Sequence, residues 1–223
     1  MKNNPTLSLQ YLARPPAASG GQPPMLILLH GVGSNEADLF SLAPHLDERF
    51  LILSARAPLA RQPGSYAWYP VQFTPTGFLI DPDAALRSQQ ILSRFIGEAV
   101  EAFAADAQRV VLMGFSQGAI MSLNTMLTQP ETLSGVVAMS GRLLTALQST
   151  WAEPERLRGF PVVVAHGQYD EVIPIEEGRA IRDYLSTLPV NLTYHEYPMG
   201  HTISEASLAQ VQAWLTEQLD APK

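Results

Sequence analysis

The chain carries a series of short apolar runs, most of them continuous, separated by stretches with helical spacing. A run without polar alternation is typical of a strand that is covered on both faces, as in a parallel sheet flanked by helices. These runs are "MLILLH" at 25–30, "FLILSA" at 50–55, "RVVLMGF" at 109–115, "SGVVAMS" at 134–140, "FPVVVAHG" at 160–167 and "VNLTYHEY" at 190–197. A further edge strand is expected at 6–11, before a proline- and glycine-rich turn at 14–24.

Helical patterns lie between these runs. Asp81 is a candidate N-cap with Pro82 at the first helical position, and apolar residues then recur every three or four positions up to Phe103. The same spacing predicts helices at 118–129, 175–188 and 204–219, listed in chain order. Since strands and helices alternate, we predict a single α/β domain over residues 1–223, with a mostly parallel central sheet and helices on both faces. Ligands of such sheets bind at the carboxyl ends of the strands.

Residues 55–80 depart from this rhythm. The segment is rich in proline and glycine and carries the aromatic residues Tyr66, Trp68, Tyr69, Phe73 and Phe78. A loop of this length in a compact domain is either functional or disordered, and the aromatic residues argue against disorder. We therefore predict a long ordered loop near the active site.

Composition narrows the class of protein. A chain of 223 residues, 46% of them hydrophobic, is sufficient for one large core. The absence of cysteine excludes disulfides and thiol nucleophiles, and a net charge of −7 with scattered arginines argues against a nucleic-acid partner. The N-terminal stretch "MKNNPTLSLQYLARPP" lacks the apolar run of a signal peptide, and "MLILL" is too short to cross a bilayer. We expect a cytoplasmic protein without stable membrane insertion.

The stretch "GFSQGA" places a serine between two glycines where a predicted strand passes into a predicted helix. Residues 114–118 fit the G-x-S-x-G pattern, a sharp turn that exposes the serine with a strained backbone. The strand and helix that the pattern requires are both predicted on either side of it. Ser116 is therefore the candidate nucleophile.

A serine hydroxyl needs a base and a group that orients the base. Asp170 and His201 each follow a predicted strand, so both belong on the same rim as Ser116, and the order Ser, Asp, His is the one this type of fold uses. An aspartate in such a loop is also a common helix cap. His30 and His166 each precede a glycine at a strand end, where they brace loops or, if the strands are misplaced, supply the base.

The tetrahedral intermediate of acyl transfer needs hydrogen-bond donors for its oxyanion. The backbone N–H of Gln117 and that of Val32, in the loop "HGVGSNEADLF", are the candidates. A dinucleotide-binding loop is the rival interpretation, but Glu36 stands at its third glycine position, where a carboxylate would repel pyrophosphate. The dispersed histidines predict no metal site.

With these residues placed, the chain resembles the carboxylesterase/phospholipase branch of the α/β-hydrolase fold, which includes acyl-protein thioesterases and small bacterial carboxylesterases. The motifs that carry the resemblance are "LLHGVGSNEADL", "RAP", "YAWYP", "GFSQGA", "AHGQYDEVIP" and "YPMGHTIS". The resemblance implies Ser116 as nucleophile, His201 as base and then acid, and Asp170 as the orienting carboxylate, with Val32 and Gln117 as oxyanion donors. Val32 and Thr202 depart from the residues that are common in the family at those positions.

The resemblance also implies acyl esters or thioesters with an apolar acyl group as small-molecule substrates, and no cofactor. Trp68, Tyr69, Phe73 and Ile173 are the candidates for the wall of the acyl pocket, although these aromatic residues would equally pack the loop onto the body of the domain. We predict a serine carboxylesterase that works through an acyl-enzyme. A long-chain acyl thioesterase or lysophospholipase, and a non-catalytic binding module of the same fold, are the alternatives. The oligomeric state, a homodimer included, is left open.

Overall fold

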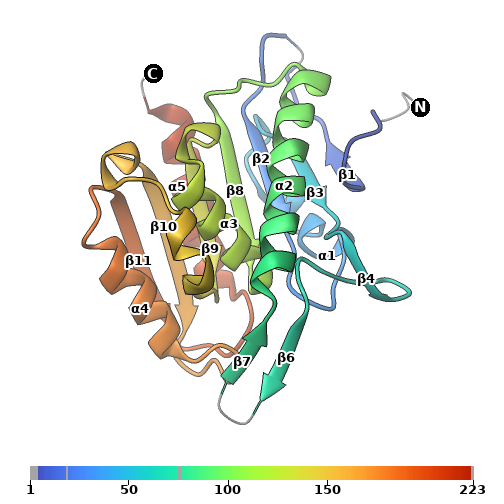
Figure 1. Cartoon of the computed structure of the whole chain (residues 1–223). Coiled ribbons are helices and arrows are strands. Elements are labelled where there is room, and N and C mark those ends of the chain that lie inside the picture. Colours follow the sequence, from blue (N-terminus) through green and yellow to red (C-terminus); the bar gives the residue numbers. More distant parts are fainter. Residues whose placement is uncertain (1–4, 19, 75–76, 222–223) are drawn as a thin grey trace.

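The computed structural model describes residues 5–18, 20–74 and 77–221, with the side chains of residues 73–78 outside the description. Its centre is a seven-stranded sheet in the order β1-β3-β2-β8-β9-β10-β11 (Figure 1). β1 pairs with β3 antiparallel, and the other neighbouring strands are parallel. The strands of this sheet are β1 (Tyr11–Arg14), β2 (Met25–Leu29), β3 (Leu51–Ala55), β8 (Val110–Phe115), β9 (Gly135–Met139), β10 (Pro161–Gly167) and β11 (Asn191–Tyr197). The predicted α/β fold with a mostly parallel sheet is confirmed.

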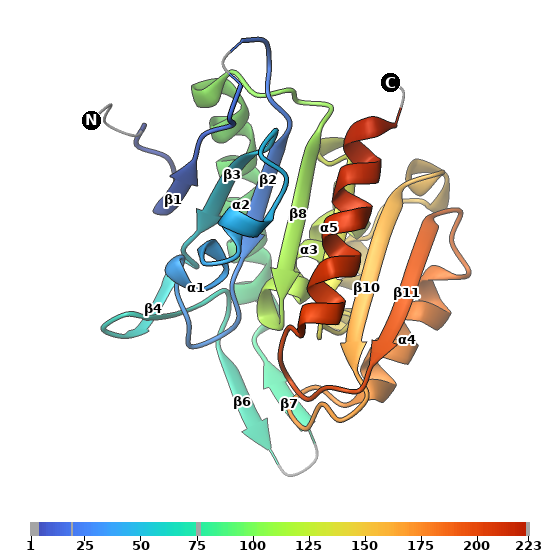
Figure 2. The ribbon, with the colours of Figure 1, turned by 180° about the vertical axis from the view of Figure 1, so that it is seen from behind.

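Helices cover both faces of the sheet. One face carries α2 (Pro82–Phe103), α3 (Gln117–Thr128) and α4 (Ile175–Leu185), and the other carries α1 (Ala37–Phe40) and α5 (Glu205–Asp220), as Figures 1 and 2 show from opposite sides. Short 3₁₀ helices complete the chain: η1 (Ala43–His45), η2 (Pro130–Thr132), η3 (Thr145–Thr150) and η4 (Pro154–Leu157). In the described part of the chain, no helix combines the length and the apolar character needed to cross a membrane.

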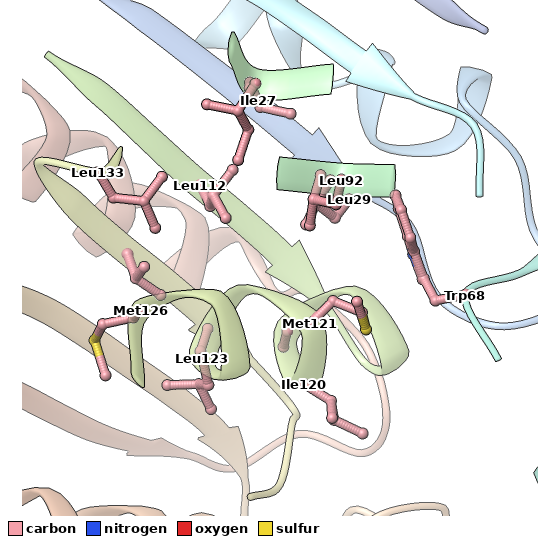
Figure 3. Close-up of a cluster of buried hydrophobic side chains, with 14 of the residues drawn as sticks. Ile27, Leu29, Trp68, Leu92, Leu112, Ile120, Met121, Leu123, Met126 and Leu133 are labelled. Atoms are coloured by element: carbon pink, nitrogen blue, oxygen red, sulfur yellow. The ribbon is translucent and has the colours of Figure 1, made fainter. Parts of the chain in front are cut away.

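The two helix layers explain why β2 is apolar at every position. In β2, Ile27 and Leu29 belong to the core cluster under α2 and α3, whereas Leu26 and Leu28 belong to the cluster under α1 and α5. Successive side chains of a strand point to opposite faces, so both sets must be apolar. Figure 3 shows the first cluster, in which side chains from β2 and β8 lie among those of α2 and α3, together with Trp68 from the segment after β3.

Capping residues begin the two long helices where the sequence predicts them. The Asp81 carboxylate accepts a hydrogen bond from the Ala84 N–H at 3.1 Å, and Ser204 forms a capping box with Ser207 at the start of α5. α4 is shorter than expected and ends at Leu185 rather than at residue 188. The N–H groups of Thr187 and Leu188 bond three residues back, so the last turn tightens before Pro189, which cannot continue a helix.

The edge strand lies later in the chain than predicted. β1 spans Tyr11–Arg14 and not 6–11, so it shares only Tyr11 with the predicted strand and ends at the first residue of the expected turn. Its position is set by β3, because Tyr11 pairs with Ala55 and Arg14 pairs with Ile52. The Arg14 guanidinium also donates hydrogen bonds to the carbonyls of residues 43, 46, 47 and 50, which holds the end of β1 against the η1 segment.

The segment 55–80, predicted as a long ordered loop near the active site, is ordered into two hairpins. β4 (Leu59–Gln62) pairs with β5 (Ser65–Ala67), and β6 (Val71–Thr74) pairs with β7 (Gly77–Ile80). Pro63 and Gly64 make the first turn, with Gly64 at a φ of 75°. These strands are too short and, in β4, too exposed to carry an apolar pattern. The second hairpin projects beyond the carboxyl edge of the sheet beside the α4 loop (Figures 1 and 2).

Candidate active site

Ser116 lies at the turn from β8 into α3, with backbone angles φ 54° and ψ −119°. Such a left-handed conformation is strained for a residue with a side chain, and strain of this kind clusters at functional sites. A Cβ on Gly114 would lie 2.3 Å from the carbonyl carbon of Gly118, and a Cβ on Gly118 would lie 1.9 Å from the carbonyl oxygen of Leu29. Close backbone packing therefore requires both glycines of the motif, and the turn presents the Ser116 hydroxyl at the rim of the sheet.

Three side chains from different loops meet at this rim. The Ser116 hydroxyl lies 3.0 Å from His201 Nε2, and His201 Nδ1 lies 2.8 Å from Asp170 Oδ2. Because an ionised carboxylate only accepts hydrogen bonds, Nδ1 carries the proton and Nε2 is the acceptor for the serine. This arrangement can take the proton from the hydroxyl and stabilise the resulting imidazolium.

The loop after β10 holds Asp170 as a carboxylate. Its Oδ1 accepts hydrogen bonds from the N–H groups of Val172 at 2.9 Å and Ile173 at 2.8 Å. Burial acts to raise the pKa of Asp170, but the hydrogen bonds from His201 and from these backbone groups outweigh it, so the pKa lies below its usual value. The group stays ionised at neutral pH and can orient the imidazole.

Close approach of two loops brings His201 to Asp170. A Cβ on Gly167, at the end of β10, would lie 2.4 Å from the carbonyl oxygens of both Met199 and Gly200. The N–H of Tyr169 also donates to the Met199 carbonyl at 3.0 Å. Glycine at position 167 therefore lets the loop after β11 cross the end of β10, which places the imidazole over the carboxylate.

The other histidines make structural contacts. His166 is fully buried, and its Nε2 bonds to the carbonyl of Ile173 at 2.8 Å, which closes the loop that carries Asp170. His45 is exposed in η1, and His195 lies within β11. None of these groups, nor His30, is hydrogen-bonded to Ser116 within the described residues. In the same part of the chain, no group of His, Asp and Glu side chains is arranged to hold a metal ion.

His30 determines the direction of the Val32 N–H. The N–H of Ala57 donates to His30 Nε2 at 3.1 Å, so Nδ1 carries the proton and donates to the Gly31 carbonyl at 2.7 Å. The Gly31 carbonyl and the Val32 N–H belong to one planar trans peptide, so they point in opposite directions. His30 therefore holds the Val32 N–H on the side away from its own ring, and Val32 lines the pocket beside Ser116.

Gln117 connects the turn at Ser116 to the segment 68–69. Its side-chain Oε1 accepts from the Trp68 N–H and its Nε2 donates to the Tyr69 carbonyl, both at 2.8 Å. The backbone N–H groups of Gln117 and Val32 make no hydrogen bond to any part of the chain that the structure describes. The two N–H groups are thus available on the same pocket wall for an oxyanion.

The family model for phospholipases and carboxylesterases matches residues 17–219 of this chain, which includes every element of the site. The chain belongs to the phospholipase/carboxylesterase family. It is therefore a hydrolase with the α/β-hydrolase fold, as the resemblance implied.

Individual relatives agree with this assignment. Acyl-protein thioesterase 1 of Neurospora crassa is 29% identical over 212 residues, which cover 87% of this chain and 86% of that protein. The carboxylesterase SOBER1 of Arabidopsis thaliana is 27% identical over 156 residues, covering 69% of this chain and 68% of that protein. Among solved structures, the esterase PE8 superposes with a TM-score of 0.79 at 28% identity, covering 95% of this chain and 98% of that one.

In this hydrolase, a small pocket of about 30 Å³ opens beside Ser116. A cavity needs about 10–15 Å³ to admit one water-sized group, so this pocket admits roughly two or three such groups. Its walls are mainly apolar, with one guanidinium. The lining residues are Val32, Tyr69, Val71, Ile80, Ser116, Gln117, Ile120, Arg142, Val172 and Ile173.

The four candidate residues for the acyl wall have different positions. Tyr69 and Ile173 line the pocket. Trp68 does not: it is fully buried in the core, and its indole N–H donates to the His30 carbonyl at 3.0 Å. Both residues lie at bends of the chain after β5, and of the two only Tyr69 lines the pocket. The backbone of Phe73 lies in β6, but its side chain is outside the described residues.

Sequence reasoning missed several lining residues. Ile120 lies four positions after Ser116 on α3, so helical periodicity could have identified it. Arg142 follows the carboxyl end of β9, where ligand-binding residues are expected. Burial raises the pKa of the Tyr69 phenol, and the Arg142 guanidinium acts in the opposite direction, which places a positive charge near this wall. Nothing in the pattern of β6 and β7 pointed to Val71 or Ile80.

Proposed function

We propose that this hydrolase cleaves short-chain carboxylic esters through an acyl-enzyme formed on Ser116. The observation that carries the proposal is the continuous hydrogen-bonded series from Ser116 through His201 to Asp170, with distances of 3.0 and 2.8 Å. The order of these residues and their three separate loops are typical of serine hydrolases of this fold.

In the proposed reaction, His201 Nε2 takes the Ser116 proton as the oxygen attacks the ester carbonyl. The N–H groups of Val32 and Gln117 stabilise the oxyanion of the tetrahedral intermediate. His201 then gives its proton to the departing alcohol oxygen, which leaves the acyl group on Ser116. Water attacks this ester with His201 again as the base, and the carboxylic acid is released. All groups required are side-chain or backbone groups of the protein, so we propose that no cofactor takes part.

The test is hydrolysis of p-nitrophenyl butyrate, with a burst of p-nitrophenol equivalent to the enzyme concentration. Ser116→Ala is expected to abolish the burst, and a fluorophosphonate probe is expected to label Ser116 in the wild type. Equal hydrolysis by the Ser116→Ala variant would assign the nucleophile elsewhere. A folded wild-type protein that hydrolyses no ester and takes no label would favour a binding module.

Hydrolysis of long-chain thioesters or lysophospholipids is the second candidate. The name of the Neurospora crassa relative, acyl-protein thioesterase 1, favours it. The pocket volume of about 30 Å³ favours short acyl groups instead. A series of p-nitrophenyl esters from acetate to palmitate separates the two, because each methylene that the pocket buries contributes about 0.8 kcal/mol. We expect kcat/KM to be highest at two to four carbons; a maximum at palmitate would favour the thioesterase.

The cytoplasmic location and the oligomeric state stay predictions. Light scattering coupled to size-exclusion chromatography would test whether the protein is a homodimer.

A further inference from the structure

A second cavity lies beside His201. It has a volume of about 220 Å³ and is formed where α1 faces the loop after β11. His201 lines this cavity, whereas Ser116 lines the small acyl pocket. The residues around the second cavity are Asp38, Leu39, Ser41, Leu42, Phe115, His201, Thr202 and Ile203.

The chemistry of acyl transfer assigns the two cavities different parts of the substrate. The acyl group stays on Ser116, next to the oxyanion donors, so it belongs in the pocket that those groups line. The alcohol receives its proton from His201 and must leave past the imidazole. The cavity that His201 lines is therefore on the path of the alcohol.

One wall of the second cavity carries a negative charge that the protein does not neutralise. The Asp38 side chain accepts a hydrogen bond from the Ser34 hydroxyl at 2.6 Å, which orients the carboxylate. Among the described residues, no arginine or lysine forms a salt bridge with Asp38, whereas the neighbouring Glu36 is paired with Arg56. The net charge of −7 adds to the attraction for a cation.

The remaining walls suit a compact group with apolar surface. The lining includes the apolar residues Leu39, Leu42, Phe115 and Ile203, and the hydroxyl residues Ser41 and Thr202. The Phe115 ring packs against the His201 imidazole with a centroid distance of 4.8 Å. A group bound in this cavity therefore lies close to both rings. Methyl groups of a quaternary ammonium make contacts of this kind with aliphatic and aromatic side chains.

We propose that this cavity is the leaving-group subsite and that Asp38 makes it selective for esters of cationic alcohols, the amino-alcohol class. This inference rests on the proposed function. It predicts that kcat/KM is highest for esters of cationic alcohols, lower for esters of neutral alcohols and lowest for esters of anionic alcohols. Leaving groups that carry a phosphate, whether they are thiols or alcohols, are disfavoured because the negative charge of the phosphate would face the Asp38 carboxylate.

The experiment compares three butyrate esters whose alcohols differ mainly in charge: butyrylcholine, its neutral carbon analogue 3,3-dimethylbutyl butyrate, and 3-sulfopropyl butyrate. The value of kcat/KM reports on acylation, the step in which the alcohol leaves, and a pH-stat at low ionic strength measures it without a chromophore. Intrinsic reactivity differs among the esters, so the quantity compared is the ratio of cationic to neutral substrate in the wild type and in variants.

Asp38→Asn keeps an acceptor for the Ser34 hydroxyl and removes the charge. We expect it to lower the cationic-to-neutral ratio about three- to fivefold, the range for an exposed charge pair. It should raise the relative rate of the sulfonated ester. Glu101→Gln removes one exposed negative charge at the far end of α2 and is expected to leave the ratio at the wild-type value. Salt at about 0.5 M should reduce the wild-type ratio toward that of Asp38→Asn.

An unchanged ratio in Asp38→Asn would overturn the proposal, as would an equal loss in Glu101→Gln. These outcomes are distinct from failure of the proposed function itself. In that case the wild type would not hydrolyse p-nitrophenyl butyrate, or Ser116→Ala would hydrolyse it equally well.

Discussion

The imidazole of His30 donates a 2.7 Å hydrogen bond from Nδ1 to the carbonyl of its neighbour Gly31, and the same peptide group carries the N–H of Val32, which lines the pocket beside Ser116. We expect His30→Phe, which keeps the ring and loses the donor, to lower kcat about 10- to 100-fold with little change in KM. Removal of a complete oxyanion donor costs about 10²–10³ in kcat, so a misdirected donor should cost less.

His30→Asn is the matched variant, because the Asn amide nitrogen can occupy the position of Nδ1 and restore most of the rate. A trifluoromethyl ketone forms an oxyanion on the serine, so its affinity should fall in parallel with kcat in the Phe variant. If the inhibitor bound both variants equally, His30 would have only a structural role.

Acid should destabilise the protein through His30. Burial lowers the pKa of this histidine below its usual value of about 6.5, so the unfolded state binds a proton that the folded state does not. The contribution of His30 to stability is therefore complete above about pH 6.5 and is lost as the pH falls below it toward the folded pKa. Urea unfolding between pH 5 and 8 measures this, and the dependence above pH 5 should be weaker in His30→Asn. An unchanged profile in that variant would attribute the acid sensitivity to other groups.

Two glycine substitutions should have opposite effects. Gly118→Ala places a Cβ 1.9 Å from the Leu29 carbonyl oxygen, a clash between two backbones that cannot relax easily. We expect a loss of about 4 kcal/mol or more in the free energy of unfolding, or failure to fold.

Gly97→Ala is the control, since the added Cβ meets nothing within 4 Å on the exposed side of α2. Alanine in a helix interior is more stable than glycine by about 0.5–1 kcal/mol. For a chain of this size, that raises Tm by roughly 1–4 °C. Similar changes in Tm in both variants would mean that the close backbone packing at Gly118 does not decide the stability of the protein.

Shortening a side chain that lines the acyl pocket should change the preference for acyl-chain length. Ile120→Ala removes apolar volume from the pocket wall, so longer acyl groups gain buried surface. Each newly buried methylene should raise kcat/KM by about fourfold, from about 0.8 kcal/mol. The maximum in the p-nitrophenyl ester series should move to longer chains by one or two carbons.

Trp68→Phe provides the comparison. Trp68 is buried in the core rather than in the pocket, and the variant leaves the His30 carbonyl without its indole donor. We expect a loss of about 1–3 kcal/mol in stability and an unchanged position of the maximum. A shifted maximum in this variant would indicate that Trp68 contributes to the acyl wall.

Local pattern was sufficient for the positions of the parallel strands β2, β3, β8, β9, β10 and β11 and for the turn at Ser116. The alternation of β2 side chains between two cores makes every position apolar, and the two glycines of the turn are required by contacts that any sequence with this turn must satisfy. The placement of Ser116, Asp170 and His201 at one rim could be predicted because each residue follows a strand, and parallel strands bring their carboxyl ends to the same edge of the sheet.

The shape of the pocket and the position of the edge strand depended on contacts between segments that are distant in the sequence. β1 begins at Tyr11 because β3 is its partner, although Leu7 and Leu9 before it also alternate as in a strand. Trp68 and Tyr69 are adjacent aromatic residues with the same local signal, and both are buried, but only Tyr69 is packed where it also lines the pocket beside Ser116. Ile80 and Arg142 reach the same pocket from separate segments. Periodicity along the chain indicates which side of a helix or strand is buried. Which side chains meet across a cavity depends instead on how whole helices and strands pack against one another.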